Sequence, residues 1–288
     1  MMPTIIRNKI RRHGVSGGTR RRPWGSLVLL GLITAACLLA GLLAPYPSDL
    51  MDSTAISQPP GGSHLLGTDH MGRDLFSLLL YGGRASLYIG LLSGSLSTVI
   101  AVVYGTISGL AGERVSDLMM RFAEMIMSVP SILLVLFLQA IWGTATPTSI
   151  AVVIAVTSWM NISKVVRSEV RQIRNSDYIL AARTMEAPFW YLLLRHLVPN
   201  FISSIMFMVV TNIGQAMLTE STLSFLGLGL PLTTVSWGSL MSLSQNVLLS
   251  GCWWMILIPG LVLVTTLVCI TNLGECIRRE NNRIYSNL

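Results

Sequence analysis

The chain has 288 residues, of which 52% are hydrophobic and only 11% are charged. A soluble domain carries roughly 25% charged residues because its surface faces water. This composition therefore excludes an ordinary soluble protein and indicates an integral membrane protein surrounded by lipid. The formal net charge of +7 does not indicate a nucleic-acid partner, because the basic residues lie in short segments between apolar runs rather than in one basic patch.

Six apolar runs are long enough to cross a bilayer, which needs about 20 residues. A signal peptide is the alternative for the first run, but its length and the Pro45–Pro47 stretch after it favour an uncleaved helix. The Pro- and Gly-rich stretch 45–84 is predicted to be an external loop. The six predicted transmembrane helices are 26–44, 85–110, 118–142, 148–166, 201–222 and 253–273.

Two features of these runs predict how the helices pack. Pro130 lies inside the third run and predicts a kink, because proline removes a helical hydrogen bond. The second run contains two pairs of glycines at a spacing of four, which let helix backbones approach closely. These pairs are Gly90 with Gly94 and Gly105 with Gly109.

The positions of the basic residues predict the topology, because cytoplasmic loops carry an excess of Lys and Arg. With a cytoplasmic N-terminus, only Arg73 and Arg84 among the 20 Lys and Arg residues fall on or near the outer side. The predicted fold class is therefore an all-α integral membrane protein with six transmembrane helices and both termini in the cytoplasm. The chain divides into a basic cytoplasmic tail (1–25), a first transmembrane helix with its external loop (26–84), a transmembrane core (85–273) that contains a polar cytoplasmic segment (167–199), and a cytoplasmic tail (274–288).

The sequence contains no pattern typical of an enzyme. It has no G-x-x-x-x-G-K-[ST] phosphate-binding loop and no nucleophile–base arrangement, so any ATP-driven work must come from another subunit. His64 and His70 alone are weak evidence for a metal site, and no cofactor is expected on this chain. The four cysteines have no CxxC spacing and are predicted to be packing residues; they are Cys37, Cys252, Cys269 and Cys276.

A polar insert of two predicted short helices interrupts the apolar runs between residues 177 and 200. Asp177 is suited to cap the first helix, and Pro188 fits the first turn of the second. One interpretation is a pair of helices lying on lipid, with Arg183 and Arg195 on headgroups. The other is a segment that a cytoplasmic partner protein binds and moves.

The insert resembles the EAA loop of ATP-binding-cassette (ABC) importer permeases. Ala181, Ala182, His196 and Pro199 match that pattern, whereas Leu180 and Glu186 stand where the family has Glu and Gly. In the family this loop is the coupling helix, which sits in a groove of the ATPase subunit. The resemblance thus implies an ATPase-coupling role for Asp177, Tyr178, Ala181, Ala182, Arg183, Glu186, Pro188, His196 and Pro199.

Motifs outside the insert are similar to the dipeptide/oligopeptide/nickel permease family, in particular its second permease subunit. They are His64–Asp74, Tyr81–Ser86, Leu223–Gly229 and Ser236–Gly238. The resemblance implies a type I ABC importer permease in the cytoplasmic (inner) membrane of a bacterium. It also implies a second homologous permease subunit, two ABC ATPases that bind ATP and Mg, and an extracytoplasmic substrate-binding protein as partners.

The expected substrate is a peptide, with nickel or a metal–chelate complex as the alternative within the same family. Two other classes remain open. A secondary transporter or channel working alone would place ionisable residues in mid-membrane, and Glu220 is the acidic candidate for this role. A membrane scaffold without transport activity would need no polar path.

Two groups of residues are candidates for function in the transmembrane core and its external loop. The first is predicted to dock or gate a binding protein, with a structural turn held by an Asp–Arg pair as the alternative. It consists of Gly67, Thr68, Asp69, Gly72, Arg73 and Asp74. The second is predicted to line the translocation path, with structural pairing or capping as the alternative for Glu220. It consists of Glu220, Asn212 and Gln215.

Overall fold

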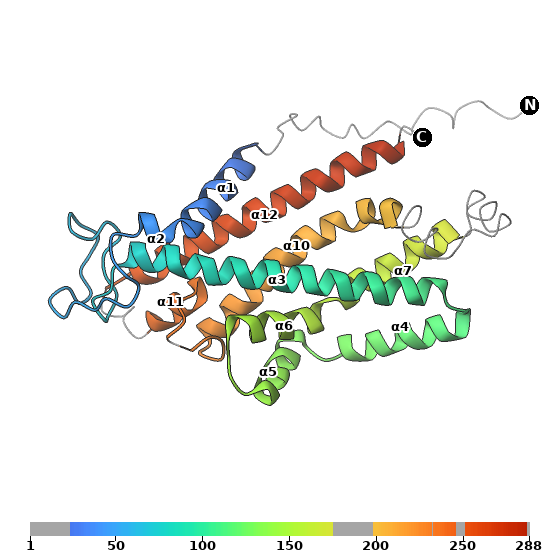
Figure 1. Ribbon diagram of the computed structural model, residues 1–288, viewed down its shortest axis with the longest axis horizontal. Helices are drawn as coiled ribbons and strands as arrows, with labels where there is room; N and C mark the ends of the chain where they lie inside the picture. Colours follow the sequence, from blue (N-terminus) through green and yellow to red (C-terminus); the bar gives the residue numbers. More distant parts are fainter. Residues whose placement is uncertain (1–23, 175–197, 232, 246–250, 287–288) are drawn as a thin grey trace, which may run out of the picture.

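The computed structural model describes residues 24–174, 198–231, 233–245 and 251–286, and these residues form an elongated helical bundle (Figure 1). Within these residues, β-type pairing is limited to an isolated bridge between Thr68 and Asp74. The helices are α1 (Trp24–Leu38), α2 (Ala40–Leu43), α3 (Leu75–Leu110), α4 (Glu113–Met127), α5 (Ser131–Trp142), α6 (Pro147–Ser158), α7 (Met160–Arg174), α10 (Val198–Phe225), α11 (Trp237–Leu243) and α12 (Trp254–Ser286).

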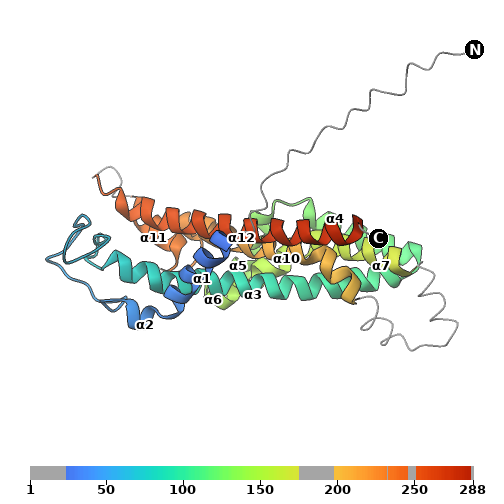
Figure 2. The same ribbon diagram turned by 90° about the horizontal axis from the view of Figure 1, so that it is seen from above.

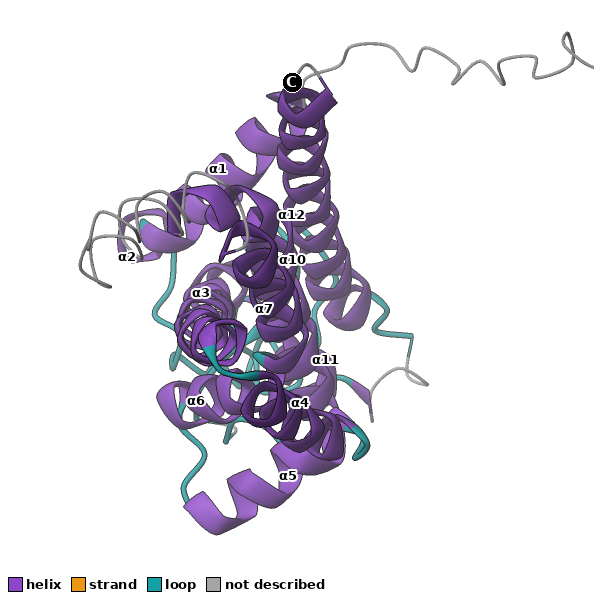
Figure 3. Ribbon diagram, turned by 90° about the vertical axis from the view of Figure 1, so that its right-hand side faces the viewer, coloured by secondary structure: helices purple, strands orange, loops and turns teal. Residues whose placement is uncertain are grey.

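Helix α3 runs through the centre of the bundle and packs against α6, α7 and α10. Seen along the bundle, α1 and α12 lie on one side of α3 and α10, and α4, α5 and α6 lie on the other (Figure 3). The glycines of α3 allow this close packing. A Cβ atom on Gly94 would lie 2.5 Å from Ile213 of α10, and one on Gly105 would lie 2.7 Å from Val166 of α7.

The two ends of the bundle differ in what they carry. The segment 45–74 and α11 lie at one end, whereas the end of α7, the start of α10 and the end of α12 lie at the other (Figures 1 and 2). The sequence assigns the first end to the outside and the second to the cytoplasm. We therefore name them the outer end and the inner end.

The second predicted transmembrane helix begins earlier than the sequence suggested. It starts at Leu75 rather than at residue 85, so the last part of the predicted loop 45–84 is helical. The reason is a cap that composition did not reveal: the Asp74 carboxylate accepts a 2.8 Å hydrogen bond from the Ser77 backbone nitrogen. Gly82 and Gly83, which suggested a loop, are buried where α3 meets Ser236 and Trp237.

Two predicted single helices are broken in the structure. The third, predicted over 118–142, consists of α4 and α5 with a bend of 87° between them, and the fourth consists of α6 and α7 with a bend of 46°. Pro130 stands directly before α5, so the predicted distortion at this proline is confirmed. At 1.5 Å per residue, the 12 residues of α5 extend only about 18 Å, which is less than the roughly 30 Å of a bilayer core.

The number of membrane spans is therefore not fixed by these helices. Among the described residues, α3 and the stretch Trp254–Glu280 of α12 are each long and apolar enough to cross a membrane, and each bent pair could add one more. Between residues 257 and 268, the exposed side chains of α12 are all apolar. They are Leu257, Leu261, Val264 and Val268, each about half exposed, as expected for a surface in contact with lipid.

Two further differences concern the end of the chain. Residues 223–252 lie between the fifth and sixth predicted transmembrane helices, where no helix was predicted. In the structure, Trp237–Leu243 form the short helix α11, which begins with a capping box between Ser236 and Ser239. The predicted last span ended at residue 273, but α12 continues to Ser286. The polar tail thus begins as a direct extension of the helix.

Candidate functional site

A buried ion pair organises the outer segment 45–74. The Asp69 carboxylate accepts hydrogen bonds of 2.8 Å from the backbone nitrogens of Met71 and Arg73 and one of 2.7 Å from Arg73 Nε. Arg73 Nη2 also lies 2.7 Å from Asp69 Oδ2. Asp69 is 3% exposed and Arg73 is 5% exposed. The structure thus contains the Asp–Arg pair that the structural alternative predicted.

Gly67 and Gly72 turn the chain around this ion pair. Their φ angles are +80° and +75°, a region that side chains with a Cβ atom rarely adopt. A Cβ atom on Gly72 would also overlap the carbonyl oxygen of Asp52, and one on Gly67 would lie 2.6 Å from the carbonyl oxygen of Gln58. Both positions therefore need glycine for space as well as for backbone conformation.

Thr68 forms hydrogen bonds within the outer segment and with α12. Its hydroxyl donates to the carbonyl oxygen of Ala55 and accepts a 2.8 Å hydrogen bond from the Gln58 backbone nitrogen. Its carbonyl oxygen accepts a 3.3 Å hydrogen bond from Trp254 Nε1. Because Thr68 is fully buried, its side chain supports the fold of this segment rather than presenting a surface.

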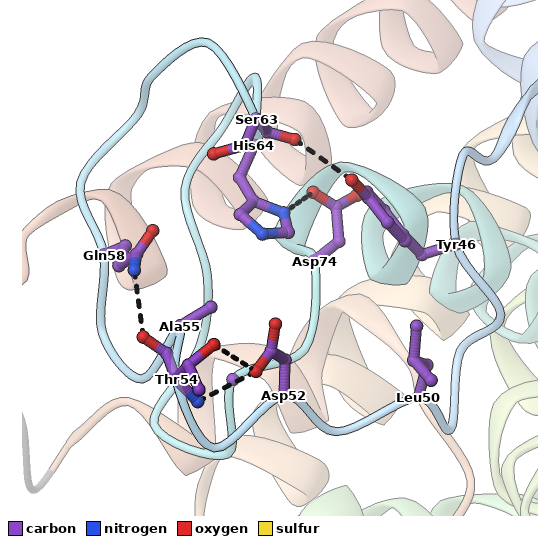
Figure 4. Close-up of a pocket in the computed structure, with 10 residues that line it drawn as sticks. Tyr46, Leu50, Asp52, Thr54, Ala55, Gln58, Ser63, His64 and Asp74 are labelled. Carbon is purple, nitrogen blue, oxygen red and sulfur yellow. Dashed lines mark hydrogen bonds and ion pairs between the residues drawn. The ribbon is translucent and has the colours of Figure 1, made fainter.

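A polar pocket of about 280 Å³ opens in the outer segment (Figure 4). His64 Nδ1 lies 2.9 Å from Asp74 Oδ1 on one side, and the Tyr46 ring packs against the His64 ring. On the other side, the hydroxyl and backbone nitrogen of Thr54 donate to Asp52. The hydrogen bond from the Thr54 hydroxyl and, to a smaller extent, the one from its backbone N–H lower the pKa of the exposed Asp52 carboxyl group below its usual value.

The predicted docking residues therefore divide into two groups. All six are buried in the structure; Gly72 and Asp74 also line the inner wall of the pocket, whereas Gly67, Thr68, Asp69 and Arg73 are not among its lining residues. Within the described ranges, no group of three or more His, Cys, Asp or Glu residues is arranged to hold a metal ion.

The three residues predicted to line the translocation path do not share one face of α10. Asn212 donates a 2.6 Å hydrogen bond from Nδ2 to Ser97 Oγ on α3, and Glu220 is fully buried. Gln215 is exposed. Since successive residues of a helix are about 100° apart, Gln215 lies roughly 140° around the helix from Glu220. The side chains of Gln215 and Glu220 therefore point to different sides of α10.

Four serine hydroxyls surround the Glu220 carboxylate. Oε1 accepts 2.8 Å hydrogen bonds from Ser224 and Ser236, and Oε2 accepts weaker ones from Ser221 at 3.3 Å and Ser86 at 3.4 Å. No role was predicted for these serines, although Ser86, Ser224 and Ser236 lie within the quoted motifs.

At the inner end, α7 is tied to α3 and α4 by basic side chains. Arg174 Nη1 donates a 2.9 Å hydrogen bond to the carbonyl oxygen of Leu110, the last residue of α3. Arg167 binds Asp117 at 2.7 Å, and Lys164 lies 3.1 Å from Glu124. The helix α7 is therefore attached to its neighbours up to its last residue, Arg174, shortly before the polar insert.

Most of the predicted coupling residues lie outside the described residues. These are Asp177, Tyr178, Ala181, Ala182, Arg183, Glu186, Pro188 and His196. Pro199 is the second residue of α10. The insert thus connects α7, which ends at Arg174, with α10, which begins at Val198.

Comparison with known proteins identifies the class. The family model "Binding-protein-dependent transport system inner membrane component" matches residues 101–279, which is more than half of the chain, so the protein belongs to this family. It is a multi-pass protein of the cytoplasmic membrane and a permease subunit of an ATP-driven importer. Members of this family are not themselves catalytic.

Individual relatives and solved structures agree with this class. The chain is 33% identical to the dipeptide transport system permease protein DppC of Bacillus subtilis over 87% of this chain and 78% of the relative. It is 34% identical to the oligopeptide transport system permease protein OppC of the same organism over 83% of this chain and 78% of the relative.

Solved transporters share the fold at low sequence identity. The methionine ABC transporter MetNI in inward-facing conformations matches with a TM-score of 0.56 and 18% identity, covering 71% of this chain and 96% of that chain. An amino acid ABC transporter crystallised with histidines matches with a TM-score of 0.53 and 13% identity, covering 71% and 94%. These likenesses support the type I importer permease fold for the chain.

Proposed function

We propose that this protein imports peptides as one of two permease subunits of a binding-protein-dependent transporter. The observation that carries the proposal is the similarity to permeases named for dipeptide and oligopeptide transport, at 33–34% identity over most of both chains. Relatives from Brucella suis are named as putative peptide permeases as well. These names do not favour the nickel alternative.

The proposed machine needs subunits that this chain does not supply. A second homologous permease would complete the translocation path, and two ABC ATPases would bind ATP and Mg. An extracytoplasmic binding protein would deliver the peptide to the outer end. The exposed rim of the pocket in Figure 4, where Asp52 lies, is the part of the outer segment that such a protein could touch.

The arrangement at the inner end supports a coupling role for the insert. The insert joins α7 directly to α10, and both helices pack against α3. Because Arg174 ties the end of α7 to the end of α3, a force on the insert would act on all three helices together. Alternating access requires such a group of helices to move against the other permease subunit.

Gln215 is the predicted path residue whose placement suits that role. Its side chain is exposed in the described chain, and an amide side chain at membrane depth is most stable where it meets water or another polar group. A neutral amide would hydrogen-bond to peptide groups of any sequence, whereas a charged side chain would select by charge. We therefore place Gln215 in the path of the proposed peptide.

The test is reconstitution of the complete transporter in liposomes with radiolabelled peptides and, in parallel, radioactive nickel. We expect ATP-dependent peptide uptake that requires the binding protein, and no nickel uptake. Uptake of peptide by this chain without ATP would contradict the proposal and favour a secondary transporter or channel.

A second experiment tests the coupling segment. Deletion of Leu180–Pro188 should abolish co-purification of the ATPases while the chain still inserts into the membrane. A deletion variant that still retains the ATPases would show that the insert does not couple the two subunits.

A further inference from the structure

The buried carboxylate of Glu220 lies where three helices meet at the outer end of the bundle. It belongs to α10, as do Ser221 and Ser224, whereas Ser86 belongs to α3 and Ser236 caps α11. All four serines are at most 3% exposed, and Glu220 is not exposed at all. One side chain thus contacts every element that meets at this point.

The hydrogen bonds around Glu220 have a consistent direction. The Ser86 hydroxyl oxygen accepts from the Trp237 backbone nitrogen at 3.2 Å, Ser224 from Leu230 at 3.3 Å and Ser236 from Ser239 at 3.1 Å. Each of these hydroxyl groups therefore uses its own O–H to donate a hydrogen bond to a carboxyl oxygen of Glu220. Hydrogen bonds linked in this way polarise one another, so the set is stronger than the same bonds in isolation.

These relays reach backbone groups that would otherwise be unsatisfied. Leu230 lies in the connection after α10, and Trp237 and Ser239 are in the first turn of α11, whose N–H groups have no partner within the helix. A buried backbone N–H without a partner is costly. The Glu220 carboxylate therefore orients the serines that cap both the connection and the start of α11.

The same region is packed too closely to move freely. α10 ends in a Schellman motif, in which Gly227 has a φ of +76° and the Leu228 nitrogen donates to the Leu223 carbonyl oxygen at 2.9 Å. A Cβ atom on Gly238 would lie 2.5 Å from Ser221 Cα. Trp237 is fully buried and donates from Nε1 to the Leu79 carbonyl oxygen of α3 at 2.9 Å.

We propose that Glu220 is a positioning residue that fastens the return segment, residues 226–231 and 233–243, to α3 and α10, so that these elements move as one unit at the outer end during transport. Glu220 does not contact the transported solute. The inference rests on the proposed function, because only a transporter that alternates between states needs the outer end to move as a unit. Of the two roles that the sequence left open for Glu220, path and anchor, it assigns the anchor.

The serines separate this role from a role in the path. The Ser236 and Ser224 side chains are buried and cannot touch a solute, so Ser236→Ala and Ser224→Ala should reproduce the effect of Glu220→Gln. Ser93→Ala is the matched control, since Ser93 is a fully buried serine of α3 whose hydroxyl donates only to carbonyl oxygens of its own helix.

Two measurements on the complete transporter in nanodiscs test the proposal. The first is hydrogen–deuterium exchange of the amides in 233–243, measured without substrate. We expect at least tenfold faster exchange in Glu220→Gln, Ser224→Ala and Ser236→Ala than in Ser93→Ala. The second is the number of peptides transported per ATP hydrolysed, which we expect to fall at least threefold in the same three variants while ATP hydrolysis continues.

The outcomes that would overturn the proposal are distinct from those that would overturn the peptide function. The proposal fails if both serine variants match the Ser93→Ala control in amide exchange and in the number of peptides transported per ATP. That result would show that Glu220 does not act through the serines. A Glu220→Gln variant that changes only the preference for charged peptides would assign it to the path instead. If the substrate is not a peptide, the exchange measurement still decides the anchoring role, because it contains no substrate.

Discussion

Arg84 of α3 donates a 2.7 Å hydrogen bond from Nε to the carbonyl oxygen of Cys37 at the end of α1. Its Nη2 donates another of 2.7 Å to Leu38, the last residue of that helix. The last carbonyl groups of a helix have no partner within it, and a cation there also suits the helix dipole. Arg84 therefore closes α1 and attaches it to α3.

Arg84→Ala should release the end of α1. Each charged hydrogen bond contributes about 1.5–3 kcal/mol, so the loss of both should let α1 separate from α3 far more often. Cys37 is buried between them, and it should react with a membrane-permeant maleimide at least tenfold faster in this variant. The background should lack Cys276, which is partly accessible. Arg84→Lys, which keeps a charge but not two fixed donors, should lie between; labelling equal to wild type in Arg84→Ala would contradict the cap.

Removal of one partner of the Asp69–Arg73 pair should destabilise the outer segment more than removal of both. Breaking a buried ion pair leaves one charge without a partner and costs about 3–5 kcal/mol. We expect Asp69→Ala and Arg73→Ala each to lower the thermal unfolding temperature, and the double variant to be less destabilised than the sum of the two. Additive effects of the single variants would show that the two side chains are not coupled.

Alanine substitutions at three glycines separate the cost of a positive φ angle from the cost of a steric clash. Gly62 has neither a positive φ nor a close neighbour, Gly143 has a φ of +87° in open space, and Gly72 has both a positive φ and a blocking carbonyl group of Asp52. A strained residue costs about 1–3 kcal/mol. The loss of unfolding free energy should therefore be near zero for Gly62→Ala, intermediate for Gly143→Ala and largest for Gly72→Ala. A different order would contradict the φ angles and close contacts described for these three positions.

Gly105→Leu should disrupt the contact between α3 and α7. A Cβ atom at this position would already lie 2.6 Å from the Ser163 carbonyl oxygen, so a larger side chain must push the helices apart. We expect a lower yield of folded protein in detergent, measured by size-exclusion chromatography, and weaker stimulation of ATP hydrolysis by the binding protein. Gly31→Leu is the control, because Gly31 of α1 has no neighbour within 4 Å; equal behaviour of the two variants would argue against close packing.

Particular elements show where sequence reasoning succeeded and where it failed. Pro130 predicted the break before α5 because a proline acts on its own helix. The paired glycines predicted close packing of α3, and they do contact α7 and α10. The start of α3 at Leu75 was missed, because Asp74 acts as a cap only through the hydrogen bond that its carboxyl group accepts from the Ser77 backbone nitrogen in the folded chain. The short helix α11 was missed since its seven residues have too little periodicity to be recognised.

The sequence by itself determined that this protein lies in the membrane, that it carries a polar insert and that it resembles importer permeases, because composition and motifs are properties of the chain alone. Only the tertiary structure decided that Asp69, Arg73 and Glu220 are buried and that Gln215 is exposed. Their exposure depends on which helices pack on which side of α3 and α10. The physical reason is that a polar residue in a membrane protein must find a partner or water, and its partners come from residues as distant in sequence as Ser86 and Glu220.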